Sequence, residues 1–189
     1  MWSHRQEPII IDRNRDWAHN ILESSKWFDK DVKVIASIRD IPSIMASWTT
    51  LYKNDHPHCS QSVIDRFLFH MWNNHTKPYV DSFVKMNKEA GDRVLFFSYD
   101  DIVSKPWDHF TQIEDFLDLP RFRYDLENIQ GEFQDSNIIP GGFKDLHKIR
   151  PKYEKVSVPP EQALGPKLYK KFLDLDEKFK SELYHGNYQ

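Results

Sequence analysis

The chain of 189 residues is poor in cysteine and glycine, with a single cysteine, Cys59, and six glycines. One cysteine excludes an internal disulfide and a cysteine-rich zinc site, which fits a reducing compartment. No apolar run approaches the ~20 residues that a membrane-spanning helix needs. The first residues, "MWSHRQEP", also lack the apolar core of a signal peptide. We therefore expect a soluble, cytoplasmic protein that does not contact a membrane.

The sequence also lacks an excess of positive charge, since its formal net charge is -3. This balance gives no support to a nucleic-acid partner, because binding the phosphate backbone requires clustered Lys and Arg. Aromatic residues make up 14% of the chain, whereas disordered chains contain few of them. Length and composition together predict a single globular domain over residues 1–189.

Short apolar runs alternate with segments of helical periodicity along the chain. The runs with the length of buried strands are 8–11, 33–39 and 93–99. The helical segments are 16–28, 41–54, 60–75, 78–91 (ending at Gly91), 107–119 and 161–185. Strands that alternate with helices predict an α/β domain with a parallel sheet covered on both faces. Ligands of such sheets bind at the carboxyl ends of the strands.

Arg39 lies at the end of the second predicted strand, and Ser47 lies eight residues later on the polar face of helix 41–54. A helix N-terminus favours an anion, and a guanidinium and a hydroxyl that converge there suit one phosphate group. A surface ion pair of Arg39 and a solvated Ser47 would explain the same pattern. These residues alone leave both interpretations open.

The third predicted strand ends at Tyr99, which begins the segment "YDDI", and the following helix ends in "FLDLP". Together with Arg39 and Ser47, this segment resembles the sulfotransferase family, which has "YEDL" and a "FLGLP"-like end and uses 3'-phosphoadenosine-5'-phosphosulfate. The resemblance implies a fold like that of the P-loop kinases. It also implies that Arg39 and Ser47 bind the 3'-phosphate of this donor, and that Tyr99 lies near its adenine.

Two further segments are similar to the family. In "PIIIDRNRDW", Asp12 takes the place of an acid that is the catalytic base in several family members, and Arg13 would stabilise charge on the leaving phosphate. An ion pair of Asp12 with Arg13 or Arg15 is the structural alternative. "PGGFKDLHKIRPKYEK" (140–155) resembles a late basic loop that closes over the donor. Its candidates for phosphate or acceptor contacts are Lys144, Lys148, Arg150 and Lys152.

The sequence departs from the family pattern at its beginning. Family members open with a strand and a glycine-rich loop of the type "PRSGTT" that holds the 5'-phosphosulfate, and nothing of this kind precedes Pro8. We therefore expect a fold without its first strand and loop. The chain could be part of a larger product, receive the loop from a separate segment, or use a different loop.

The resemblance implies sulfuryl transfer to a hydroxyl or amine of a carbohydrate or small-molecule acceptor. The alternative is a non-catalytic nucleotide-binding or interaction domain that kept the 3'-phosphate site. A nucleotide kinase is a weaker third option, because the sequence contains no GK[ST] motif. Sulfuryl transfer needs no metal, and the stretch "DHPHC" (55–59) is explained more simply as solvated surface than as a metal site.

Overall fold

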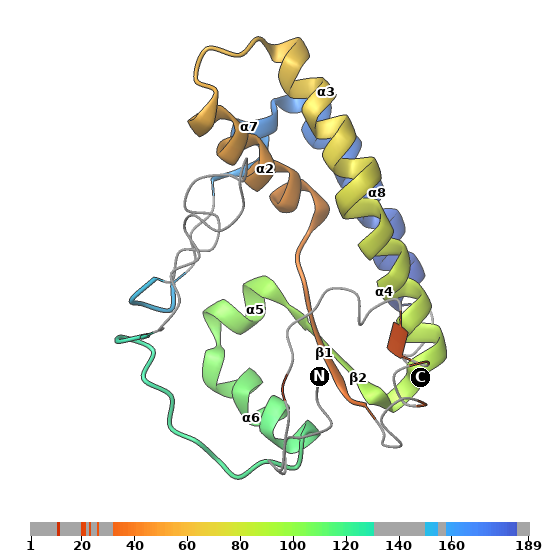
Figure 1. Cartoon of the computed structure of the whole chain (residues 1–189), viewed down its shortest axis with the longest axis vertical. Coiled ribbons are helices and arrows are strands. Elements are labelled where there is room, and N and C mark those ends of the chain that lie inside the picture. Colours follow the sequence, from red (N-terminus) through yellow and green to blue (C-terminus); the bar gives the residue numbers. More distant parts are fainter. Residues whose placement is uncertain are drawn as a thin grey trace.

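The structure is a computed structural model of the chain, and it describes residues 11, 20, 21, 23, 26, 32–130, 150–154 and 158–184. Strands β1 (Val34–Ile38) and β2 (Val94–Ser98) pair in parallel, in a register that runs from Val34 opposite Val94 to Ile38 opposite Ser98. In Figure 1, α4 lies on one side of these strands and α5 and α6 lie on the other. The predicted α/β class with a parallel sheet flanked by helices is confirmed.

Several helices lie between the two strands in sequence, and the others follow β2. They are α2 (Ile41–Asp55), α3 (Gln61–Met71), a π-helical turn η1 (Trp72–Thr76), α4 (Lys77–Ala90), a 3-10 turn η2 (Gly91–Arg93), α5 (Tyr99–Ser104), α6 (Pro106–Phe116), α7 (Pro160–Leu164) and α8 (Pro166–Tyr184). Strands 33–39 and 93–99 and helix 41–54 were therefore predicted almost to the residue. The predicted strand at 8–11 lies outside the described residues, apart from Ile11.

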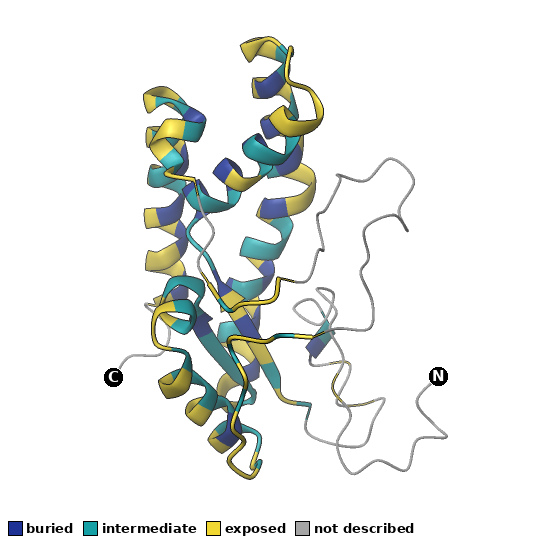
Figure 2. Cartoon of the chain, turned by 90° about the vertical axis from the view of Figure 1, so that its left-hand side faces the viewer, coloured by how far each residue is buried: buried dark blue, intermediate teal, exposed yellow. Residues whose placement is uncertain are grey.

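The main core lies between α2, α3, α4 and α8, where the dark blue residues of Figure 2 line the facing sides of these helices. Ile41, Met45 and Leu68 are at most 1% exposed there, and Phe172 and Phe179 of α8 close the cluster. Apolar residues at helical spacing on α2 and α8 predicted this arrangement, since such a stripe must face the core.

A second, smaller core joins the sheet to α4. Ala36 of β1 packs with Met86 and Ala90 of α4, and with Ile21 from the predicted helix 16–28. The opposite face of β1 is less covered, and its Ile35 is 39% exposed. The expectation of full cover on both faces is therefore met only in part.

The two helices predicted at 60–75 and 78–91 form one continuous rod. The prediction of a break was wrong because Pro78, which lacks an N–H, lies in the first turn of α4, where a proline is tolerated. The turn η1 carries the backbone across this point, with the Lys77 N–H donating to the Trp72 carbonyl five residues earlier. Conversely, the predicted helix 161–185 is two helices, which are separated at Gly165 with a φ of 75°.

Helix α6 ends earlier than predicted, in a turn at Asp118. Its φ of 56° is left-handed, and the Leu119 N–H donates to the Glu114 carbonyl at 2.8 Å. This geometry closes many helices and favours glycine, which is also the residue of the "FLGLP" pattern at this position. The Asp118 carboxylate pairs with Lys33 at 3.1 Å but is 87% exposed, so the pair contributes little to stability.

We therefore expect Asp118→Gly to raise the free energy of unfolding by about 0.5–1 kcal/mol, because glycine adopts a positive φ without a Cβ penalty. Asp118→Ala, which also removes the pair with Lys33, should be less stable than the unchanged protein. Urea unfolding of the three proteins measures the difference. Equal stability of the glycine and alanine variants would contradict the backbone explanation.

Candidate functional site

Two residues, Arg39 and Asp40, connect the end of β1 to the start of α2. The residues on either side are fixed in the core, since Ile38 is 6% and Ile41 is 0% exposed. Asp40 is the N-cap of α2, and its carboxylate accepts the Ser43 backbone N–H at 2.8 Å. This short connection holds Arg39 at the carboxyl edge of the sheet, where ligands of α/β domains bind.

The parallel pairing brings Tyr99 to the same edge. Ile38 is the register partner of Ser98, so Arg39 and Tyr99 are the residues that directly follow the two paired strands. The guanidinium carbon of Arg39 lies 4.7 Å from the centre of the Tyr99 ring, in a cation–π contact. The structure thus joins two residues that the sequence singled out separately.

Arg39 has a buried nitrogen to which the described residues offer no hydrogen-bond partner. Its Nε is buried, and no described residue accepts a hydrogen bond from it. Leaving a buried donor unpaired costs about 1–3 kcal/mol, and more when the group is charged. Such a donor at the carboxyl edge of a sheet is suited to an anionic ligand.

The N-terminus of α2 was expected to attract a ligand anion, but protein carboxylates already fill it. Asp176 of α8 accepts the Ile41 backbone N–H at 2.9 Å and pairs with Lys180 at 2.7 Å. Pro42 has no N–H to offer, and Asp40 accepts the following one. A ligand anion at this place must therefore be bound by side chains rather than by the end of the helix.

Asp176 and Lys180 were not among the residues that the sequence singled out. Asp176 is 2% exposed and lies four residues after Phe172 and three before Phe179, on the apolar stripe of α8. A carboxylate within an apolar stripe indicates a buried polar partner, and this spacing could have revealed it. Burial lowers the pKa of Lys180, but the hydrogen bond and charge of Asp176, together with the charges of Asp40 and Tyr184, raise it by more, so its pKa is raised overall.

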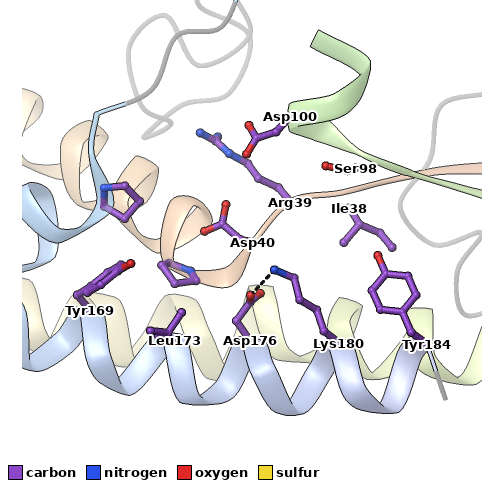
Figure 3. A pocket seen from close by; sticks show the side chains of 12 residues that line it. Ile38, Arg39, Asp40, Ser98, Asp100, Tyr169, Leu173, Asp176, Lys180 and Tyr184 are labelled. Carbon is purple, nitrogen blue, oxygen red and sulfur yellow. Dashed lines mark ion pairs between the residues drawn. The ribbon is translucent and has the colours of Figure 1, made fainter. Parts of the chain in front are cut away.

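A pocket of about 370 Å³ opens at this edge, between the ends of β1 and β2, the start of α2, and α8 (Figure 3). This volume lies within the range of small-molecule sites. Its polar lining includes Arg39, Asp40, Asp100, Tyr169, Asp176 and Lys180. Ser47 is exposed on α2 and is not among the residues that line the pocket.

Backbone hydrogen bonds join the two segments that lie on either side of residues 131–149. The Ile129 N–H donates to the Pro151 carbonyl and the Tyr153 N–H to the Leu126 carbonyl, both at 2.8 Å. The two ends of this part of the chain, which includes most of the predicted basic loop, are therefore held together.

Tyr153 places this junction, in which residues 126–129 and 151–153 are hydrogen-bonded, beside the carboxyl edge of the sheet. Its hydroxyl donates to the Ile102 carbonyl of α5 at 3.2 Å. Burial raises the pKa of Tyr153, and the neighbouring Tyr99 raises it further. Arg150, three residues before Tyr153, is exposed. The junction thus connects the predicted basic loop to the helix that begins with Tyr99.

Four of the predicted site residues lie outside the described residues, namely Asp12, Arg13, Lys144 and Lys148. Lys152 pairs with Glu127 at 2.8 Å, and this hydrogen bond is the main cause of its raised pKa. The described part of the chain contains no group of three or more His, Cys, Asp or Glu side chains that could hold a metal ion. No helix within it has both the length and the apolar character to span a bilayer.

The comparison with known families agrees with this architecture. A sequence model of the sulfotransferase family matches residues 8–123, which is more than half of the chain. The matched range contains Arg39, Ser47 and Tyr99 and ends before the predicted basic loop. No curated protein and no solved structure matches the chain. The strands, the helices between them and the family match lead to one conclusion: the chain belongs to the sulfotransferase family.

Proposed function

We propose that this protein transfers a sulfuryl group from 3'-phosphoadenosine-5'-phosphosulfate to a hydroxyl or amine of a carbohydrate or small-molecule acceptor. Membership of the sulfotransferase family indicates sulfuryl transfer in general. The observation that carries the proposal for this donor is the Nε of Arg39, which is buried at the carboxyl edge of the sheet and has no hydrogen-bond partner among the described residues. A charged donor in that position suits the 3'-phosphate, the group that distinguishes this nucleotide from ordinary adenine nucleotides.

Residues around Arg39 support a nucleotide rather than a simple anion. The ring of Tyr99 lies under the guanidinium at 4.7 Å, which holds the fork of nitrogen donors in one orientation. We propose Ser47 as a second 3'-phosphate contact, and Lys144, Lys148 and Arg150 as further contacts from the basic loop. Tyr99 would then lie near the adenine, as the family resemblance implies.

The chemistry requires a base and positive charge. The donor supplies an activated sulfuryl group on a phosphate leaving group. We propose that Asp12 accepts the proton of the acceptor hydroxyl while the new oxygen–sulfur bond forms. At the same time the bond between the sulfur and the bridging oxygen breaks, and that oxygen leaves with the phosphate. Arg13 would stabilise the charge that develops on the leaving phosphate.

Arg39→Ala tests the assignment of the 3'-phosphate. We expect adenosine 3',5'-bisphosphate to bind more tightly than adenosine 5'-monophosphate, and the substitution to remove most of this difference. A charge-assisted hydrogen bond contributes ~1.5–3 kcal/mol, so the bisphosphate should lose about tenfold or more in affinity. Calorimetric titration of both nucleotides measures the effect.

Arg66→Ala is the matched control, because Arg66 is an exposed arginine of α3 outside the pocket. It should leave both affinities unchanged. If the unchanged protein binds both nucleotides equally, the 3'-phosphate has no site here, and the proposed donor is wrong.

A further inference from the structure

The pocket at the strand edge contains a second cation, which comes from the other end of the chain. Lys180 of α8 lines the pocket together with Arg39 of the β1–α2 connection. In Figure 3, Arg39 extends towards Asp100, whereas the ammonium of Lys180 lies across the pocket beside Asp176. The two cations therefore face different parts of one cavity.

The carboxylates of the pocket are largely engaged with the protein. Asp40 accepts the Ser43 N–H. One oxygen of Asp176 accepts the Ile41 N–H, and the other binds Lys180. These carboxylates fix the walls of the pocket, and Asp176 also holds Lys180 in place.

Lys180 keeps donors for a ligand. An ammonium group has three N–H donors, and Asp176 uses one of them. The side chain is 47% exposed, so the remaining donors are accessible to solvent and to a ligand. A lysine that one carboxylate orients while its other donors face a cavity is well placed to bind an anion.

We infer that Lys180 is a second anion-binding residue of this pocket and contacts the 5'-phosphate of the nucleotide whose 3'-phosphate binds Arg39. The inference rests on the proposed function, and it adds a specific contact from the C-terminal helix. A ligand with two phosphates on opposite sides of a ribose matches a pocket with cations on two walls. Lys180 lies outside residues 8–123, the range of the family match.

The test uses Lys180→Gln, because glutamine can still donate a hydrogen bond to Asp176 but carries no charge. We expect this substitution to lower the affinity for adenosine 5'-monophosphate and for the 3',5'-bisphosphate by about five- to tenfold. The affinity for adenosine 3'-monophosphate should fall by less than about twofold. Lys180→Arg should restore most of the affinity, since it returns the charge. Calorimetric titration of the three nucleotides against the full chain gives each value.

The chain offers a matched control in Lys178→Gln. Lys178 is also on α8 and also has an acidic partner four residues away, Glu182 at 3.8 Å, but it does not line the pocket. It should change none of the three affinities. Unchanged binding of the 5'-monophosphate by Lys180→Gln would overturn the inference, as would a selective loss of 3'-monophosphate binding.

Failure of this inference can be distinguished from failure of the proposed function. If the unchanged protein prefers the bisphosphate and loses that preference with Arg39→Ala, the 3'-phosphate site is present. An insensitive Lys180→Gln variant would then remove only the role of Lys180.

Discussion

Asp12→Asn should lower the rate of sulfuryl transfer by ~10²–10⁴-fold, the usual contribution of a general base. Asparagine has nearly the same shape as aspartate but cannot accept the acceptor's proton. Nucleotide affinity should stay nearly unchanged, because the base acts on the acceptor rather than on the donor. The assay is transfer of labelled sulfate to a panel of hydroxyl and amine acceptors, with calorimetry for nucleotide binding.

Asp81→Asn is a suitable control, since Asp81 is an exposed residue of α4 that pairs with Lys77. It should keep the full rate. The alternative role of Asp12 is an ion pair with Arg13 or Arg15. A variant that keeps its turnover but unfolds at a lower temperature would assign Asp12 that structural role.

An unchanged protein that binds the bisphosphate but transfers sulfate to none of the acceptors would favour the second hypothesis, a nucleotide-binding domain without catalysis. The two hypotheses share the 3'-phosphate site and differ in the chemistry at Asp12. Binding and turnover must therefore be measured on the same protein preparation.

Local patterns predicted the sheet and its edge well. The apolar runs that became β1 and β2 are too short for helices, and the segments between them have a clear helical period. A parallel pair places the residues after both strands at one edge, so Arg39 and Tyr99 could be expected to meet there. Their contact at 4.7 Å follows from this register.

Other features depended on contacts or local compensations that the sequence pattern does not display. Residues 60–75 and 78–91 were predicted as two helices, but η1 shifts the hydrogen-bond pattern between them and the rod continues. The short helix α5 was missed because six residues show too little periodicity. The helical spacing of Asp176 indicates that it is buried with a polar partner, but no local pattern identifies Ile41, 135 residues away, as that partner.

Asp176→Ala should lower the free energy of unfolding by about 2–3 kcal/mol, a factor of about 30–150 in the folding equilibrium. The Asp176 side chain is buried and its carboxylate accepts the Ile41 N–H at 2.9 Å, so its removal leaves a buried donor without a partner. Lys180 is 47% exposed and can be solvated instead, which keeps the cost below that of a fully buried ion pair. Urea unfolding measures the change.

Asp174→Ala is the matched control on the same helix, because Asp174 is exposed and its pair with Lys170 at 3.5 Å is solvated. It should change stability by less than about 0.5 kcal/mol. A similar loss in both variants would show that helix α8, rather than the contact to α2, is sensitive to substitution.

The pH dependence separates the two interactions of Asp176. The pKa of Lys180 is raised above its ordinary value of 10.5 in the folded protein, so the ion pair contributes stability below that pH. The contribution should disappear as the pH rises further and Lys180 loses its proton. The hydrogen bond from Ile41 does not depend on Lys180, so most of the difference between Asp176→Ala and the unchanged protein should persist at high pH. If the whole difference disappeared there, the ion pair rather than the buried backbone contact would be what Asp176 contributes to the fold.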